Sequence, residues 1–334
     1  MAAVLVKCSA CGAVAAHGDT YCEGCGHTLA GPAAAPAAPC ARCGGPVADG
    51  ACAACGLART GRRDHVEARA GTGAGVSDRG LRHTRNEDAL ALRALRRGGA
   101  ATTAAVVCDG VSTSPRPAAA SAAAAEAGAA ALAEETAAGA GPAAALTTAL
   151  RRAGRAVAAL AGPGPQAPAC TFVAALVPAR GPITVAWVGD SRAYWLAAAP
   201  TAAPSALLTS DDTWAQTMVA LNALTPEEAA RSPHAHALTA WLGADYGEVR
   251  GRTADLAPRG PGALLLCTDG LWNLLPDPAD LAALVLGAGP DPLDAARACV
   301  RLALERGGPD NVTACVIGVP AAPPHGPAAR GGAR

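Results

Sequence analysis

The amino-acid sequence predicts an α+β domain that follows a small cysteine-rich module. Two observations predict the domain. Short apolar, β-branched runs recur along the chain, and two alanine-rich helical stretches lie grouped between the first two runs instead of alternating with strands. A third observation predicts the module, because eight of the 13 cysteines lie before residue 56. With 334 residues, 51% of them hydrophobic, the chain is long enough for roughly two domains with packed cores.

The balance of charges argues against one class of function. The 27 basic and 27 acidic residues cancel, and aromatic residues make up only 3% of the chain, so neither a basic surface nor a stacking platform for nucleic acid is expected. The stretch from Ala118 to Ala133 is interrupted by Ser121 and Glu126 and lacks the ~20 strongly apolar residues of a membrane span. Because no charged-then-apolar signal is found around Lys7, we expect a cytoplasmic protein with reduced thiols.

Eight cysteines form an internal repeat in residues 1–60. They are arranged as four C-x-x-C pairs, Cys8 with Cys11, Cys22 with Cys25, Cys40 with Cys43, and Cys52 with Cys55. A C-x-x-C turn points two thiolates at one ion, and two such turns complete a closed tetrahedral zinc site. A glycine follows each pair, where it can adopt the positive φ of the turn. The sequence therefore predicts a double zinc ribbon with two structural Zn²⁺ ions, which fold the module and perform no chemistry.

Other uses of these thiols are less well supported. A redox C-x-x-C of the thioredoxin type would lie in a βαβ pattern, which the surrounding sequence lacks. His17 and His27 could replace a cysteine as ligands, but four complete pairs leave no vacancy. We therefore expect the ribbons to recognise a partner or substrate protein.

The elements of the domain follow a segment that we interpret as a linker. Residues 61–75 are rich in arginine and glycine, show no apolar period, and miss the G-x-G-x-x-G spacing of a dinucleotide site. Strands are then predicted at 102–108, 171–177, 183–188, 263–267 and 312–319. Helices are predicted at 117–138, 142–161, 213–221, 226–230 and 292–305, several of which begin at a proline.

Acidic residues follow the ends of several predicted strands. They are Asp109, Asp190 and Asp269, accompanied by Glu87 and Asp88 upstream and by Asp310 before the last strand. One Asp-Gly after a strand is a turn signal, but several carboxylates at one sheet edge repel each other and raise each other's pKa unless cations lie between them. Oxygen ligands without His or Cys select Mg²⁺ or Mn²⁺. The acids therefore predict a site for these cations.

Six motifs in this part of the chain resemble those of a known family. They are Ser77-Asp78-Arg79-Gly80 with Asn86-Glu87-Asp88, Val107-Cys108-Asp109-Gly110, Val188-Gly189-Asp190-Ser191-Arg192, Leu208-Thr209-Ser210-Asp211-Asp212, Cys267-Thr268-Asp269-Gly270-Leu271 and Asp310-Asn311-Val312-Thr313. In this order they look like the motifs of the metal-dependent type-2C (PPM) Ser/Thr protein phosphatases. The resemblance implies that residues 76–319 form a four-layer α-β-β-α sandwich, two antiparallel sheets flanked by helices. Residues 320–334 are expected to form a flexible tail.

The resemblance also implies an active site with two Mn²⁺ or Mg²⁺ ions. Carried over by position, the ligands are Asp109 on both ions, Glu87 and the Gly110 carbonyl on one ion, and Asp269 and Asp310 on the other, while Asp88 orients bound water. Asp190 is expected to be mainly architectural. Such a site hydrolyses phosphoserine and phosphothreonine with a metal-activated water and no phosphoenzyme. The implied partners are phosphorylated Ser/Thr proteins and a bacterial-type Ser/Thr protein kinase.

Three departures from the family pattern lie near this site. His83 stands where many relatives have an arginine that binds the substrate phosphate. We expect Arg82 or Arg85 to reach the phosphate, or His83 to bind it as imidazolium or act as general acid, with a surface role for His83 left open. The run from Val111 to Ser114 replaces the usual glycines, and Gln166 stands where relatives have an aspartate of a third metal site. We therefore expect a third site to be weak or missing.

The remaining features complete the hypothesis. The stretch after Asp212, with Trp214, His234 and His236, is interpreted as a flap that shapes the access of protein substrates, with both histidines at the surface. The five cysteines after residue 60 are expected to pack in the core. The leading hypothesis is an active Ser/Thr phosphatase with ribbons for recognition. The alternatives are a pseudophosphatase adapter that binds phosphoproteins and a nucleic-acid binder with a regulatory phosphatase domain.

Overall fold

The structure is a computed structural model that describes residues 64–97, 99–164, 166–198, 204–245, 247 and 251–320, together with four short strands before them. These short strands form two antiparallel pairs, β1 (Leu5–Lys7) with β2 (Val14–Ala16) and β3 (Val47–Ala48) with β4 (Ala51–Cys52). The chain divides into two compact units, residues 1–60 and 61–334. The predicted tail beyond residue 320 lies outside the described residues.

The predicted zinc ligands lie outside the part of the chain whose side chains the structure describes. This holds for all eight cysteine side chains, those of Cys8, Cys11, Cys22, Cys25, Cys40, Cys43, Cys52 and Cys55. Of these residues, only Cys52 falls in a described strand, β4, where its backbone pairs with that of Val47. The two zinc sites therefore stay a prediction from the spacing of the cysteines.

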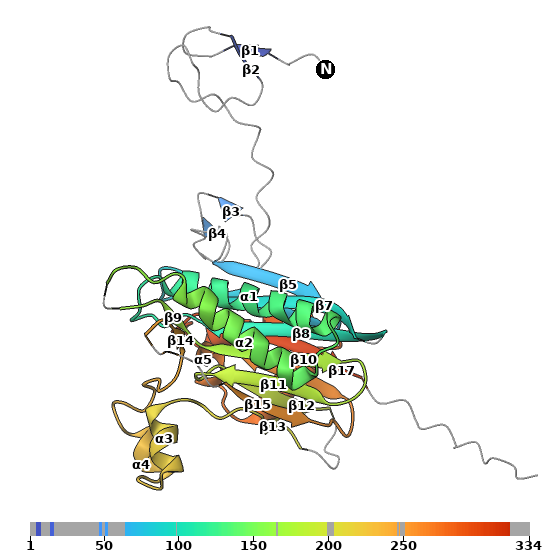
Figure 1. Ribbon diagram of the computed structural model, residues 1–334, viewed down its shortest axis with the longest axis vertical. Coiled ribbons are helices and arrows are strands. Elements are labelled where there is room, and N and C mark those ends of the chain that lie inside the picture. Colours follow the sequence, from blue (N-terminus) through green and yellow to red (C-terminus); the bar gives the residue numbers. More distant parts are fainter. Residues whose placement is uncertain are drawn as a thin grey trace, which may run out of the picture. The chain divides into compact units, whose positions relative to one another are not determined.

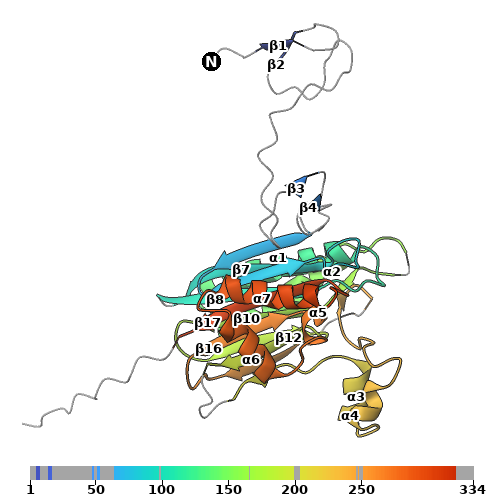
Figure 2. The ribbon, with the colours of Figure 1, turned by 180° about the vertical axis from the view of Figure 1, so that it is seen from behind.

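Two antiparallel sheets form the centre of the second unit. The first has the strand order β15 (Arg252–Leu256), β11 (Ile183–Val188), β10 (Phe172–Pro178), β8 (Ala100–Asp109) and β7 (Asp88–Arg97). The second has the order β13 (Ala206–Leu207), β12 (Arg192–Ala197), β16 (Gly262–Cys267), β17 (Val312–Val319), β6 (Gly73–Asp78) and β5 (His65–Ala70). Figures 1 and 2 show the two sheets stacked face to face between two layers of helices.

The apolar strands are buried on both faces, which explains why they read as continuous apolar runs. In β8, Val106 and Cys108 face the helices, whereas Ala105 and Val107 face the other sheet. The layer between the sheets also contains Trp195 and every second apolar side chain of β10, β11, β16 and β17, such as Val173 and Leu264. Burial at every position leaves no period-two signal for these strands, and their length and flanking turns locate them instead.

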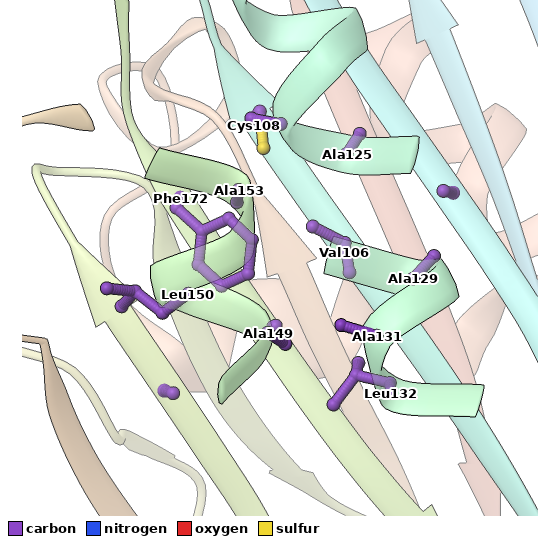
Figure 3. Close-up of a cluster of buried hydrophobic side chains, with 14 of the residues drawn as sticks. Val106, Cys108, Ala125, Ala129, Ala131, Leu132, Ala149, Leu150, Ala153 and Phe172 are labelled. Carbon is purple, nitrogen blue, oxygen red and sulfur yellow. The ribbon is translucent and has the colours of Figure 1, made fainter. Parts of the chain in front are cut away.

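Helices α1 (Pro117–Ala137) and α2 (Pro142–Ala158) cover the five-stranded sheet (Figure 1). Their buried faces are mainly alanine, which lets the helices approach the sheet and each other closely. Figure 3 shows the Phe172 ring in this layer, between the sheet and the alanines of both helices. A Cβ atom at Gly128 would lie 2.8 Å from the Phe172 ring, so the helix needs a glycine there.

Helices α6 (Pro278–Gly287) and α7 (Pro292–Glu305) cover the six-stranded sheet (Figure 2). Leu281, Val285 and Cys299 from these helices pack on Tyr194 and Leu265 of the sheet. The second unit is therefore a four-layer α-β-β-α sandwich, as predicted. None of the helices in the described part of the chain is long and apolar enough to cross a bilayer.

Three short elements lie at one end of the sandwich. Helix α5 (Asp269–Trp272) follows β16 directly, and β9 (Ala169–Cys170) pairs with β14 (Leu242–Gly243). Helices α3 (Trp214–Ala220) and α4 (Pro226–Ala230) project from the sheets in Figure 1 and form the flap that the sequence indicated. Thr213 caps α3, and Thr225 and Glu228 form a capping box at α4.

The prediction of a linker at residues 61–75 is wrong, because this stretch contains β5 and the beginning of β6. In β5, the polar residues His65, Glu67 and Arg69 alternate with small apolar residues, a period-two pattern typical of a strand with two different faces. In β6, glycine is needed for close packing, since a Cβ atom at Gly73 would lie 3.0 Å from Ile317 and one at Gly75 would lie 3.2 Å from the Ala314 carbonyl. The glycines thus belong to a buried strand.

Candidate active site

The acids predicted from the sequence meet at one end of the sandwich. Asp88 at the start of β7 is directly opposite Asp109 at the end of β8 in the sheet register. Asp269, at the start of α5, lies close enough to Asp109 for its charge to raise the pKa of the Asp109 carboxyl group. Four aspartates, Asp109, Asp190, Asp269 and Asp310, line a single cleft of about 630 Å³. The fold thus brings together side chains that lie far apart in the sequence.

Burial and mutual repulsion raise the pKa values of three of these carboxyl groups, those of Asp109, Asp190 and Asp269. Burial, followed by the charges of Asp88 and Asp269, raises the pKa of Asp109 well above its usual range. Burial and the nearby Asp310 raise the pKa of Asp269 to about 6, and burial and the nearby Asp269 raise the pKa of Asp190 to about 8. Such a cluster of like charges is unfavourable by itself and becomes favourable around cations.

Asp88 lies opposite Asp109 in the sheet, and only one of its two carboxylate oxygens has hydrogen-bond partners. Burial raises the pKa of Asp88 to about 7, although the hydroxyl groups of Thr313 and Thr268 both donate to its Oδ2 atom at 2.8 Å. Its Oδ1 atom is buried and has no hydrogen-bond partner. A buried acceptor oxygen without a donor fits a bound cation or its water, so the donor set suits a hard metal ion. Within the described residues, however, no three His, Cys, Asp or Glu side chains are gathered in a metal-coordinating group.

Asn311, between Asp310 and the start of β17, connects this turn to the segment that carries Glu87. Its Oδ1 atom accepts the Glu87 backbone N–H at 2.7 Å, and its Nδ2 atom donates to the carbonyl groups of Arg79 and Arg85 at 2.7 and 3.0 Å. The Glu87 side chain accepts a hydrogen bond of 2.6 Å from Ser112. Ser112, part of the run that replaces the family's glycines, therefore positions Glu87.

Glycines at the site permit close backbone contacts. A Cβ atom at Gly110 would lie 2.8 Å from the Glu87 carbonyl, and one at Gly270 would lie 1.9 Å from the Asn311 carbonyl. Gly80 has a φ of +73°, and a Cβ atom there would lie 2.1 Å from the Asp310 carbonyl. The Asp-Gly sequences after β8 and β16 are thus required by packing around the acids.

His83 lies beside the acids, as the sequence placed it. Its Nε2 atom is 3.1 Å from Oδ1 of Asp310, and its side chain is 31% exposed. The Nε atom of Arg85 is 3.4 Å from Oε1 of Glu87, and Arg82 is exposed. None of these three basic residues is among the described residues that line the cleft. His83 and Arg85 each contact one predicted metal ligand, whereas no such contact of Arg82 is observed.

The Gly-Asp-Ser-Arg motif supports the cleft in two ways. Arg192 binds Asp211 through two nitrogens at 2.7 and 3.0 Å and stacks on the Trp272 ring at 3.6 Å, which fixes this end of the motif. The Ser191 hydroxyl bonds to Thr171 Oγ1 at 2.7 Å, and Thr171 Oγ1 accepts the Asp109 backbone N–H at 2.9 Å. The motif thus also positions Asp109.

The sequence did not indicate one part of the cleft lining. Leu238, Trp241 and Asp245 line the same cleft as the acids, together with His236 and Gln166, which the sequence analysis had named. No spacing or motif marks this stretch, and only its aromatic and acidic residues could have drawn attention to it. His234 and His236 are both exposed, as expected. The five cysteines after residue 60 are buried, which confirms that they pack in the core.

A stacked pair of antiparallel sheets with clustered aspartates at one end defines a protein phosphatase of the 2C type. The profile of the family described as "Protein phosphatase 2C" matches residues 78–289, and the chain belongs to this family.

Individual relatives support the same assignment. The serine/threonine protein phosphatase PstP of Mycobacterium tuberculosis is 34% identical over 149 residues, which are 45% of this chain and 27% of PstP, so the chain spans about a quarter of that relative's length. The crystal structure of M. tuberculosis PstP/Ppp superposes with a TM-score of 0.60 and 30% identity, covering 76% of this chain and 100% of that structure. The PPM Ser-Thr phosphatase MsPP of Mycobacterium smegmatis, in complex with cacodylate, superposes with a TM-score of 0.57 and 27% identity. The superposition covers 74% of this chain and 97% of that structure. A PstP catalytic domain crystallised with two manganese ions superposes with a TM-score of 0.56 and 30% identity. The superposition covers 74% of this chain and 97% of that structure.

Proposed function

We propose that the protein is a metal-dependent phosphatase that hydrolyses phosphoserine and phosphothreonine in proteins. The observation that carries the proposal is the set of four aspartates that line one cleft, of which Asp109, Asp190 and Asp269 have raised pKa values, together with the unpartnered Oδ1 atom of Asp88 opposite Asp109. The two manganese ions of the related PstP catalytic domain support the same interpretation. An adapter without activity is less well supported, because all of the acids that the family motifs require are present and lie together.

The proposed metal ligands are the side chains of Asp109, Asp269, Asp310 and Glu87 and the Gly110 carbonyl, with Mn²⁺ or Mg²⁺ as the ions. Bound cations would supply Lewis acidity, which acidifies water and neutralises the charge of the phosphoryl group. Asp88, held by two threonine hydroxyls, presents its second oxygen to orient water. Of the three basic residues, His83 and Arg85 are proposed to act on the phosphate or the leaving alkoxide, since they contact Asp310 and Glu87. We propose no third metal site, because the neutral Gln166 stands in the sequence where relatives have an aspartate.

The experiment that tests this proposal is hydrolysis of a phosphothreonine peptide by the full chain, with Mn²⁺, with EDTA, and with the variant Asp269→Ala. We expect turnover that requires both Mn²⁺ and Asp269. A folded protein that binds Mn²⁺ but releases no phosphate would favour the adapter instead.

The proposal extends to the rest of the chain. Residues 1–60 are proposed to hold two structural Zn²⁺ ions through their eight cysteines and to recognise a partner or substrate protein. We place the protein in the cytoplasm, where a Ser/Thr protein kinase and its substrates would be the partners. The four C-x-x-C pairs and the phosphatase relatives support these proposals.

A further inference from the structure

Trp241 and Asp245 form a fixed pair in the part of the cleft lining that no motif marks. The Trp241 Nε1 atom donates to Oδ1 of Asp245 at 3.1 Å. Gly243 lies between them, and a Cβ atom there would be 2.6 Å from Asp245 Oδ1 and 3.1 Å from Trp241 Nε1. The glycine therefore lets the indole and the carboxylate close on each other, which places an aromatic ring and a negative charge side by side.

This pair is tied to the loop that carries the metal-site acids. Leu242 and Gly243 form β14, which pairs with Cys170 and Ala169 of β9. Cys170 in turn forms a β-bridge with Gly110, and the Ala169 carbonyl accepts the Val111 N–H at 3.0 Å. Leu242 itself is fully buried. The pair thus has a fixed position relative to Asp109 and Gly110, as a specificity site requires.

The charges of the cleft favour a basic ligand at this pair. The described lining contains five aspartates and no Lys or Arg, with His236 as its one basic side chain. Four of the aspartates belong to the proposed metal site or its immediate surroundings, but Asp245 is exposed and bonds to Trp241 instead. A carboxylate beside an indole is suited to a guanidinium or ammonium group, through an ion pair and a cation–π contact.

We propose that Trp241 and Asp245 form a subsite that binds an arginine or lysine side chain of the phosphoprotein substrate, within a few residues of the phosphorylated Ser or Thr. Arginine is preferred, because its planar guanidinium group both stacks on an indole and pairs with a carboxylate. This inference rests on the proposed phosphatase function and adds a substrate class to it. The enzyme would select phosphorylation sites with a basic neighbour.

The test uses the full chain with Mn²⁺ and a set of phosphothreonine peptides. A single arginine is moved from three residues before to three residues after the phosphothreonine, and each peptide is matched with versions that have glutamine or glutamate at that position. Two quantities are measured: kcat/KM for phosphate release, and peptide affinity by fluorescence polarisation. Hydrolysis of p-nitrophenyl phosphate, which has no neighbouring residues, reports on the metal site alone.

For the wild type we expect a preference of about fivefold or more for arginine over glutamine at the best position. Asp245→Asn should reduce this ratio to about twofold or less, and Asp245→Arg should reverse it in favour of glutamate. Glu305→Gln, which removes an exposed carboxylate outside the cleft lining, should keep the wild-type ratio. Because each ratio compares two peptides on one enzyme, a general loss of activity cancels.

The outcomes separate this inference from the proposed function. A wild type without preference, or a preference that Asp245→Asn and Asp245→Arg leave unchanged, would overturn the inference even if p-nitrophenyl phosphate is hydrolysed. If neither substrate is hydrolysed but the peptide affinity still shows an Asp245-dependent preference for arginine, the result supports the subsite and contradicts the phosphatase function.

Discussion

Asp269 begins α5 directly after β16, where burial and the neighbouring Asp310 raise the pKa of its carboxyl group to about 6. A carboxyl group whose pKa is higher in the folded protein than in the unfolded chain destabilises the fold at neutral pH, where it must be ionised. The same negative charge is what a cation would bind. The ionised Asp269 carboxylate therefore destabilises the metal-free protein and favours metal binding.

We accordingly predict opposite effects of Asp269→Asn on two measurements. Without metal, the variant should melt a few °C above the wild type, because one of several like charges is removed from a buried cluster. With Mn²⁺, the wild type should gain stability and the variant should gain little or none. Thermal unfolding in EDTA and in Mn²⁺ measures both, with Glu305→Gln as the control for loss of an exposed carboxylate. A metal-free variant less stable than the wild type would contradict the argument.

The acids of the site could be predicted from the sequence, whereas part of its lining could not. Asp109 and Asp269 each follow an apolar run and precede a glycine. The neighbouring residues are therefore enough to predict that both acids lie at a sheet edge. Trp241 and Asp245 reach the cleft only through the pairing of β14 with β9, two strands far apart in the sequence. Long-range pairing of two-residue strands leaves no periodic signal.

At the scale of elements, all five strands that the sequence located are buried on both faces, although β6 and β12, which are buried in the same way, were missed. The five predicted strands match β8, β10, β11, β16 and β17, and the predicted helices match α1, α2, α3, α4 and α7. The edge strand β5 was missed because its apolar face consists of Val66 and two alanines, which give weak contrast against the polar face. The helix α6 was missed although Asp277 caps it, since its apolar run also fits a buried strand.

Strand β5 is joined to the active-site turn by a buried ionic contact. The His65 Nδ1 atom is 2.6 Å from Oδ2 of Asp78, whose Oδ1 atom accepts the Gly80 N–H at 2.9 Å. Burial lowers the pKa of His65, but the hydrogen bonds and charges of Asp78 and Glu67 outweigh burial, so that the pKa is raised above 6.5. Protonated His65 therefore stabilises the turn that leads to His83.

The pH dependence of this contact follows from the raised pKa of His65. A group with a raised pKa contributes all of its stabilisation below its unfolded pKa of about 6.5 and loses it as the pH rises through the higher pKa of the folded state. The difference in melting temperature between wild type and His65→Gln should therefore be largest near pH 6 and shrink towards pH 9. His234→Gln, at an exposed site, serves as the control for the loss of an imidazole side chain. A His65→Gln difference that stays constant with pH would refute the contact's ionic character.

At the scale of the whole molecule, the two compact units are assigned from different observations. The family profile and the superposed structures account for the second unit, residues 61–334, because the profile covers residues 78–289. The first unit, residues 1–60, rests on the four C-x-x-C pairs alone. A unit of 60 residues buries too small a fraction of its surface to be more than marginally stable, so metal ions are the expected source of its stability.

We therefore predict that the purified full chain contains two Zn²⁺ ions per molecule, measured by elemental analysis after removal of loosely bound metal. Changing Cys8 and Cys11 to serine should lower this number to one, because one tetrahedral site loses two of its four thiolates. His17→Ala should leave it at two, since the eight cysteines already complete both sites. Loss of zinc from His17→Ala would mean that imidazole replaces a thiolate in the set, and a wild type without zinc would leave redox chemistry as the better use of these cysteines.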